Sequence, residues 1–449
     1  MDRFDAHVTA SKAQFVAELQ DLCRLPSVSA HRRSIPETAE AVAARMRVAG
    51  LTARVLPVDG GSPVVIAEAG AGRRTLLVYG HYDVQPAEPL DAWHSDPFVP
   101  EIRDGRIYAR GISDNKGPIM ARILAVESWL RTMGDLPIRV RFLIEGEEEI
   151  GSPHLAEVVR AHADALRADL ALWDSNGRDS TGHPMATLGQ KGLASFNLRV
   201  RTARQDLHSM WGTLVPNAIW RMVWALATLK DSQDRIQIDG LMDAVRPPAP
   251  AEMALLSQIP FNEARLQDSF GISGFVRALS GREALVKHLL EPTCTINGIS
   301  GGYTGPGGKT VLPAKAEAKV DIRLVPGLAP DRVSAMLRAH LDRRGFDDVE
   351  IELTSGLSPF RCPPDHPMVA LALRAAEETY GEPVVVYPTS PGSGPMAVVC
   401  EPLGFPAISV GGMNHSAANA HGPDENIYIG DYILGIRFVG RLTRTLGKP

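Results

Sequence analysis

Histidine and acidic side chains follow apolar segments of this chain at the points where those segments end. His81 and Asp83 come directly after the apolar run Thr75–Gly80. In open α/β sheets, ligands bind beyond the carboxyl ends of the strands, so a histidine there is well placed to hold a metal ion. A carboxylate two residues later can accept a hydrogen bond from the second ring nitrogen and set the tautomer. Alone, this His-x-Asp pattern is a weak signal.

Two further segments carry carboxylates in similar positions. Asp114 lies in the glycine-bounded loop Gly111–Pro118, where it could be a helix N-cap or a cation ligand. Glu145–Ser152 places four carboxylates within five residues, at the end of the apolar run Arg139–Gly146. Four such charges repel one another, and a bound cation would compensate them. One carboxylate could then be a metal ligand and its neighbour a general base.

The last two candidates complete a set on four predicted strands. Asp174 ends the run Ala168–Asp174, and His421 follows the run Phe405–Gly412. Mixed histidine and carboxylate ligands without cysteine suit zinc, manganese or cobalt. The candidate ligands exceed what one catalytic zinc needs, so we expect two metal ions about 3.5 Å apart that share a carboxylate.

The segments that carry these residues predict an α/β domain. The length of 449 residues favours two domains. The helical pattern Ile119–Met133 lies between the first two predicted strands, and alternating strands and helices indicate a mainly parallel sheet with helices on both faces. Phe405–Gly412 would join the same sheet if the middle of the chain is an insertion.

The middle of the chain has a different pattern. Gly192–Arg204 and Ala314–Pro326 alternate apolar and polar residues, which predicts antiparallel strands with one exposed face. Asn217–Leu229 and Pro330–Gly345 have helical periodicity. These elements predict an α+β sandwich, and the proline-rich stretch Arg246–Ala251 predicts a loop that leaves it.

Composition limits the class of partner and compartment. The formal net charge of −5 gives no indication of a nucleic-acid partner. The four cysteines form no CxxC pair, which fits a reducing compartment and a cytoplasmic location. The chain has no run of 18 apolar residues, so we expect no membrane span.

Together, five segments closely resemble the family-twenty metallopeptidases, which include carnosine dipeptidases, aminoacylase, carboxypeptidase G and succinyl-diaminopimelate desuccinylase. The matching segments are GHYDVQP, GISDNKGP, EGEEEIGS, the strand-end Asp174 and AHGPDEN. The segments EGEEEIGS, DLHSMWG and GGKTVLP are most similar to the carnosinase-like dipeptidase branch. The resemblance implies a discontinuous catalytic domain, residues 1–187 and 388–449. It also implies an inserted lid or dimerisation domain at residues 188–387.

The resemblance also implies a role for each candidate residue. Its metal ligands are His81 and Asp174 for one ion, Glu149 and His421 for the other, and Asp114 as the bridge. Asp83 would hold the imidazole of His81 in place. Glu148 would be the general base that takes a proton from water and leaves a hydroxide that bridges two zinc ions. The pair Gly151-Ser152 sets the register that selects Glu148 rather than Glu147.

The inserted segment matches further functional positions of the family. In relatives, the histidine at His208 reaches the active site of the other subunit, which implies a homodimer. Met210 stands where the family motif has glycine. Thr310, Arg323 and Ser393, together with His421, match positions that contact substrate. Without the resemblance, each of these residues has a structural interpretation. His208 could cap a helix, Thr310 and Arg323 could be ordinary strand residues, and Ser393 could be a turn residue.

The implied reaction is hydrolysis of an amide in a small substrate, a dipeptide or similar molecule with a free C-terminal carboxylate. Arg323 would bind that carboxylate with two parallel hydrogen bonds. The main alternative is an N-acyl amino acid amidohydrolase or a carbamoylase. A serine hydrolase is a weaker rival, because Gly298–Gly302 fits GxSxG but is followed by a Gly- and Pro-rich segment instead of a helix. A non-catalytic relative would have lost a ligand or the base, and none is missing here.

Overall fold

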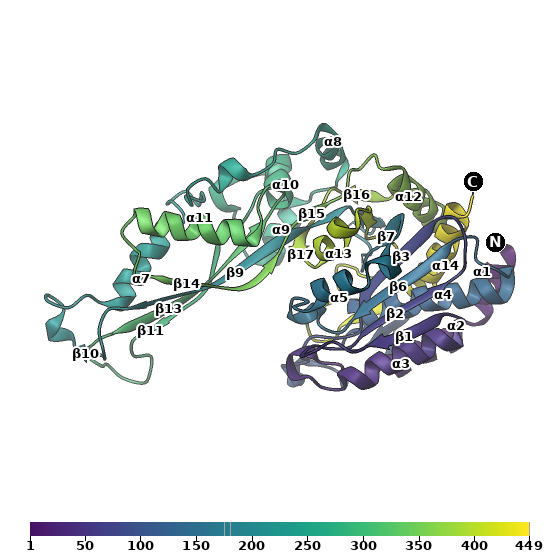
Figure 1. The fold of residues 1–449 in the computed structure, drawn as a ribbon, viewed down its shortest axis with the longest axis horizontal. Helices are drawn as coiled ribbons and strands as arrows, with labels where there is room; N and C mark the ends of the chain where they lie inside the picture. The colour runs from purple at the N-terminus through teal and green to yellow at the C-terminus, as the bar shows by residue number, and fades with distance from the viewer. Residues whose placement is uncertain (175, 180, 449) are drawn as a thin grey trace.

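The computed structural model describes residues 1–174, 176–179 and 181–448. The chain forms an α/β domain, which contains both termini, and an elongated inserted domain (Figure 1). This arrangement confirms the predicted fold class.

A six-stranded sheet forms the centre of the α/β domain. In spatial order its strands are β1 (Thr52–Leu56), β2 (Val64–Ala69), β6 (Arg139–Glu145), β3 (Thr75–His81), β7 (Leu170–Leu172) and β18 (Ala407–Ile408). Within this sheet, β2 runs antiparallel to both of its neighbours, and the pairs β6–β3, β3–β7 and β7–β18 are parallel. The strand β18 comes from the far end of the sequence, so the chain returns to this sheet after the insertion, as expected.

Helices cover both faces of this sheet because alternate residues of each strand point to opposite sides. Leu76 and Val78 of β3 pack into one core, and Leu77 and Tyr79 pack into the other. The first core is closed by α1 (Asp2–Ala10), α2 (Lys12–Cys23), α3 (Ile35–Val48), α4 (Gly117–Met133), α12 (Pro367–Tyr380) and α14 (Ile429–Leu446). The second is closed by α5 (Leu155–Ala161), α6 (Ala163–Leu166) and α13 (Met396–Leu403). Among the described helices, none combines the length and apolarity needed to cross a membrane.

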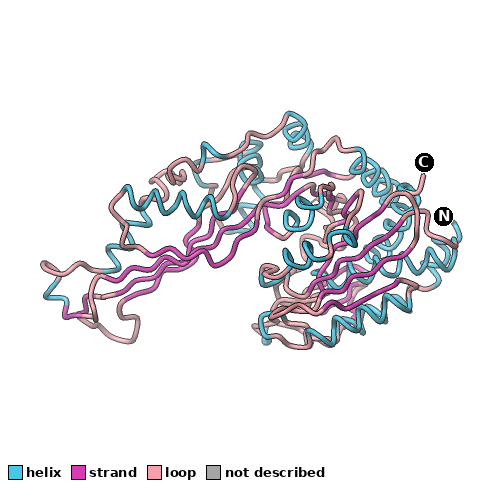
Figure 2. Tube along the Cα trace, viewed as in Figure 1, coloured by secondary structure: helices cyan, strands magenta, loops and turns pink. Residues whose placement is uncertain are grey.

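An antiparallel sheet forms the inserted domain. Its central strands are β11 (Thr295–Gly301), β13 (Lys315–Leu324), β9 (Gly189–Arg201) and β14 (Glu350–Leu357). Figure 2 shows these strands as long magenta runs that extend away from the α/β domain. The helices α7 (Ala218–Ala227) and α11 (Pro330–Arg343) bury the apolar face of the sheet. At the end farthest from the α/β domain, β10 (Leu207–His208) pairs with β12 (Val311–Leu312).

The proline-rich stretch is a loop only in its first part. Pro250 opens the helix α8 (Pro250–Gln258), where its missing N–H costs nothing. The helices α9 (Glu263–Phe270) and α10 (Gly281–Leu290) follow. We call residues 250–290 the helical excursion. The α8 and α10 helices pack together through Leu256 and Leu285.

Short strands lie where the chain passes between the two domains. The strand β8 (Met185–Thr187) pairs with β16 (Val385–Tyr387). Both β15 (Phe360–Arg361) and β17 (Ser390–Ser393) pair with the first residues of β9. The proposed domain boundaries at 187/188 and 387/388 fall at these short strands. A separate three-stranded sheet contains β4 (Glu101–Arg103), β5 (Arg106–Tyr108) and β19 (Asn426–Tyr428).

Candidate metal centre and active site

The carboxylate of Asp114 lies between two histidines. Its Oδ1 is 3.0 Å from Nε2 of His81, and its Oδ2 is 3.1 Å from Nε2 of His421. His81 ends β3 and is buried, while His421 follows β18 in a turn and is more than half exposed. One carboxylate therefore connects ligands that are 340 positions apart in the sequence.

Each histidine also faces a second carboxylate. Oε2 of Glu149 is 3.2 Å from Nε2 of His421, and Oδ1 of Asp174 is 3.8 Å from Nε2 of His81. Ligand atoms of His81, Asp114 and Glu149 all lie within 4.8 Å of one another. The five candidate ligands thus form two groups, one around each histidine, with Asp114 common to both.

Asp83 contacts both His81 and the backbone of the turn that carries Glu148 and Glu149. Its Oδ1 is 3.4 Å from Nδ1 of His81, and its backbone oxygen is 3.1 Å from the same nitrogen. Its carboxylate also accepts hydrogen bonds from the backbone N–H groups of Glu148 and Glu149, at 3.3 and 3.1 Å. Asp83 therefore orients the turn after β6 as well as the imidazole, which the sequence pattern did not indicate.

The acidic run after β6 divides between different environments. Glu145 is buried and accepts hydrogen bonds from Tyr79 Oη and Ser152 Oγ. Glu147 accepts from the N–H of Ser62 and pairs with His154, outside the metal cluster. Glu149 faces His421 as a candidate ligand, and the charge of Glu148 interacts with those of His81, Asp174 and Asp114 in the cluster. This distribution supports Glu148 over Glu147 as the base.

The cluster holds more negative charge than the protein compensates. Burial raises the pKa of Asp174 to about 7, against the opposing charge of His81. Burial also raises the pKa of Glu148 well above its usual range, and Asp174 and Asp114 add to this effect. The hydrogen bond to Asp114 is the main reason why the pKa of His421 rises to about 10. Divalent cations would compensate these carboxylates and leave the histidines neutral, so the side chains present fit a metal centre.

A buried ion pair, which the sequence reasoning missed, holds the Asp114 loop. Glu425 accepts hydrogen bonds from the backbone N–H groups of Gly111, Ser113 and Asp114, at 2.7 to 3.0 Å. Arg110 donates to Glu425 at 2.8 Å and to the backbone oxygen of His421 at 3.2 Å. The pair therefore fixes the spacing between Asp114 and His421. Glu425 lies in the AHGPDEN segment that supplied His421, so that segment carried a signal for it.

Glu425→Gln is expected to weaken both the fold and the metal centre. Arg110 would remain buried without its counter-charge, and such a broken pair typically costs about 3–5 kcal/mol. Denaturant unfolding of the metal-free protein would measure this loss, and metal titration would show weaker binding. Glu401→Gln, on the surface-facing side of α13, is the matched control. Wild-type unfolding and metal affinity for Glu425→Gln would contradict the positioning role.

Two more buried side chains position Asp174. Arg122 of α4 donates to the backbone oxygens of Tyr79, Trp173 and Asp174, which end two neighbouring strands. Asn115 donates to the Asp174 carboxylate and accepts a hydrogen bond from the N–H of His81 at 3.3 Å. The peptide bond between Asp114 and Asn115 is cis. The apolar periodicity of α4 gave no indication that Arg122 would be buried against strand ends.

The expected substrate-contacting residues fall into two places. His208 lies at the far end of the inserted domain, and its Nε2 is 3.5 Å from Thr310 Oγ1. Arg323 and Ser393 lie near the start of β9, where Arg323 pairs with Leu193 and Ser393 pairs with Lys191. Within one chain, His208 and Thr310 are thus separated from the metal cluster.

The serine motif does not form a nucleophile elbow. Ser300 lies inside the exposed edge strand β11, and the residues after it form a loop. An elbow requires a strand before the serine and a helix directly after it. The serine-hydrolase rival therefore has no structural support.

A model of peptidase family M20/M25/M40 matches residues 77–445. The chain belongs to this family. It is 30% identical to the Beta-Ala-His dipeptidase of Rattus norvegicus over 426 residues, which span 90% of this chain and 86% of the relative. The Cys-Gly metallodipeptidase dug1 of Schizosaccharomyces pombe is 28% identical over 97% of this chain and 96% of its own.

A solved member of the family has the same overall structure. The metallo-carboxypeptidase Sso-CP2 from Sulfolobus solfataricus superposes with a TM-score of 0.92 at 35% identity, and the match covers 96% of this chain and 99% of that one. The resemblance predicted from the motifs is therefore confirmed, and the protein is a hydrolase of this peptidase family.

Proposed function

We propose that this M20/M25/M40 family member is a two-metal dipeptidase that cleaves small peptides with a free C-terminal carboxylate. The observation that carries the proposal is the Asp114 carboxylate, whose two oxygens each face a different histidine. That geometry suits a ligand shared by two ions. The family relatives named as dipeptidases favour a dipeptide over an N-acyl amino acid or carbamoyl substrate.

The proposed ligands of the two ions follow the two groups of side chains. His81 and Asp174 would hold one ion, Glu149 and His421 the other, and Asp114 both. Zinc suits these nitrogen and oxygen ligands, and manganese and cobalt are the alternatives. When bound, two such ions supply an activated water of lowered pKa and polarise the substrate carbonyl.

The proposed proton carrier is Glu148. It is half-buried beside the cluster, and the hydrogen bond from its N–H to Asp83 holds the turn that carries it. Its carboxylate would accept a proton from the attacking water and return it to the leaving amine. Burial raises its pKa above that of an exposed glutamate.

The proposed carboxylate-binding residue is Arg323. In the described part of the chain, no carboxylate forms an ion pair with its guanidinium, which leaves it available to substrate. Ser393 pairs with Lys191 of β9, two residues before the Leu193 that pairs with Arg323. Its hydroxyl donates to the backbone oxygen of Gly192 at 2.8 Å. The pair would hold the C-terminal end of a dipeptide.

Arg323→Lys is expected to raise the KM for a dipeptide about 10- to 100-fold, because lysine cannot make two parallel hydrogen bonds to a carboxylate. The kcat should change much less. A dipeptide amide, which lacks the carboxylate, should be hydrolysed equally poorly by both proteins. Arg332→Lys, on the exposed side of α11, is the matched control. An unchanged KM would rule out this role for Arg323.

We further propose a homodimer formed through the inserted domain. The strand β11 is an edge strand of its sheet, and its Ile296 and Ile299 are exposed. On the adjacent α7, Trp220 and Trp224 are stacked and more than half exposed. An open strand edge beside an apolar helix face is the kind of surface that a second copy covers. His208 of the partner subunit would then complete the active site, together with Thr310 of the partner subunit.

We also propose a cytoplasmic location. Cys23, Cys294, Cys362 and Cys400 are all buried free thiols. Thiols persist in reducing compartments, so this state supports that location.

A substrate panel tests the proposed function. Metal-stripped protein is assayed with dipeptides, N-acyl amino acids and N-carbamoyl amino acids, after addition of zinc, manganese or cobalt. We expect metal-dependent hydrolysis of dipeptides, including Beta-Ala-His and Cys-Gly. Preference for an N-acyl or N-carbamoyl amino acid would overturn the dipeptide assignment, and full activity without metal would overturn the mechanism.

A further inference from the structure

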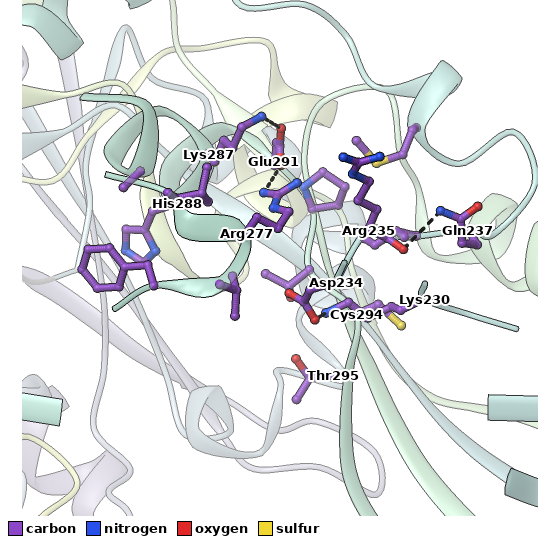
Figure 3. A pocket seen from close by; sticks show the side chains of 18 of the residues that line it. Lys230, Asp234, Arg235, Gln237, Arg277, Lys287, His288, Glu291, Cys294 and Thr295 are labelled. Atoms are coloured by element: carbon purple, nitrogen blue, oxygen red, sulfur yellow. Dashed lines mark hydrogen bonds and ion pairs between the residues drawn. The ribbon is translucent and has the colours of Figure 1, made fainter. Parts of the chain in front are cut away.

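A pocket of about 650 Å³ lies between the helical excursion and the sheet of the inserted domain (Figure 3). Its walls come from α9, α10, the turn after α9, the segment Lys230–Met242 that follows α7, and the segment Glu291–Thr295 that leads into β11. This volume is within the range of small-molecule sites, about 300–1,000 Å³. Its lining contains none of the proposed metal ligands, so it is separate from the active site.

Most of the pocket wall is apolar. Phe261 and Phe275 have ring centroids 6.3 Å apart, and both line the pocket. Leu266, Phe270 and Leu279 contribute further apolar surface. Phe270 and Val276, which both line the pocket, are 65% and 59% exposed, so this apolar wall is open to a ligand. The body of a ligand here would be aromatic or aliphatic.

The charged part of the lining has an excess of positive charge. Arg277 and Lys287 both bind the single carboxylate of Glu291, as Figure 3 shows. Arg235 adds another positive charge to the lining; Asp231, outside the lining, accepts its backbone N–H at 2.9 Å, and among the described residues no ion pair of its guanidinium is found. The remaining pair, Lys230 and Asp234, is balanced. The charged residues of the lining thus have an excess of two positive charges at an apolar pocket, which is the electrostatic complement of an amphipathic anion.

The backbone around Arg277 supports a functional site. Arg277 and the following Ala278 both have positive φ, 58° and 51°. Side-chain-bearing residues adopt this left-handed conformation at an energetic cost, and such strain concentrates at ligand-binding sites. Here it holds the guanidinium beside Glu291 at the pocket.

We propose that this pocket binds a small organic carboxylate with an aromatic or aliphatic body. Its apolar part would cover Phe270 and Phe275, and its carboxylate would bind Arg277 and Arg235. Burial of the exposed rings and one ion pair would supply the affinity.

The pocket wall is hydrogen-bonded to the proposed substrate-binding strands. Thr293 donates its N–H to the backbone oxygen of Arg323 at 3.2 Å, and its hydroxyl accepts from the N–H of Arg323 at 3.3 Å. Lys191 of β9 donates to the backbone oxygens of His288 and Glu291, at 2.8 and 2.6 Å. A ligand in the pocket would therefore alter the KM for the dipeptide. This second claim rests on the proposed function, whereas the binding claim does not.

Binding is tested by fluorescence with 1-anilinonaphthalene-8-sulfonate, an aromatic anion, on the full-length protein. Decanoate should displace the probe, and neutral decanamide should do so at least tenfold less well, because it lacks the charge. Arg277→Met and Phe275→Ala should each weaken decanoate about tenfold or more, while Arg54→Met, an exposed arginine of the α/β domain, should match wild type. Circular dichroism and metal content confirm that the variants are folded.

Equal displacement by decanoate and decanamide, or wild-type affinity in both pocket variants, would overturn the proposed site. Glu148→Gln protein should bind decanoate normally, so a failure of the site is distinguishable from a failure of the proposed catalysis. Saturating decanoate should shift the KM of wild type and leave that of Arg277→Met unchanged. An unaltered wild-type KM with the pocket filled would disprove the coupling.

Discussion

Glu148→Gln is expected to lower kcat about 100- to 10,000-fold, because a positioned general base contributes that much to proton transfer. Glutamine keeps the size of the side chain but cannot take a proton from the attacking water. The N–H of Glu148 that donates to Asp83 is unchanged by the substitution, so the turn after β6 should stay in place. Steady-state kinetics with metal-loaded protein would measure the effect, and metal analysis should show wild-type content.

The adjacent Glu147→Gln is the matched control for this prediction. Glu147 is bonded to Ser62 and His154 instead of facing the cluster, so we expect its loss to affect stability more than turnover. If the two variants had the same kcat, or if Glu148→Gln retained near-normal turnover with full metal content, the base would have to be another residue.

His208→Ala is expected to lower kcat about 100- to 1000-fold, the usual cost of removing one donor to a developing oxyanion. The separation of His208 from the metal cluster in one chain makes this a test of the dimer as well. Since the active site would combine Glu148 of one subunit with the partner's His208, the two inactive variants should complement each other. A mixed population would contain hybrid dimers with one complete site, and about a quarter of wild-type activity should return.

The complementation result separates two explanations of an inactive His208→Ala. If mixing His208→Ala with Glu148→Gln restored nothing, although the subunits exchange, His208 would act within its own chain or only on folding. His7→Ala, on α1, provides the control for an unspecific effect of losing a histidine. A fully active monomeric preparation would equally rule out the cross-subunit role.

The sequence alone was sufficient to predict where the strands of the central sheet end. Apolar runs such as Thr75–Gly80 and Arg139–Gly146 correspond closely to β3 and β6, because a buried parallel strand needs apolar side chains on both faces. Residues that follow such strands at one sheet edge must lie near one another. The proximity of His81 and Glu149 could therefore be predicted from local pattern and sheet topology.

Other features required the tertiary structure. Charged residues such as Arg110 and Glu425 are expected at the surface from sequence alone, yet these two form a buried ion pair. They are buried because three backbone N–H groups of a sharp loop need an acceptor, which Glu425 provides. The helical excursion and its pocket were likewise missed. The apolar residues of α8 and α10 do not gather on one face of each helix, so these two segments carry only a weak helical periodicity.

Local sequence thus determined which chemical groups this protein brings to the sheet edge, since strand burial and strand ends are properties of short segments. The tertiary structure decided how those groups are shared. It placed Asp114 between two histidines from distant segments, turned Glu147 away from the cluster, and put His208 with Thr310 at the far end of the inserted domain. These outcomes depend on contacts between residues far apart in the chain, and no short stretch of sequence encodes such contacts by itself.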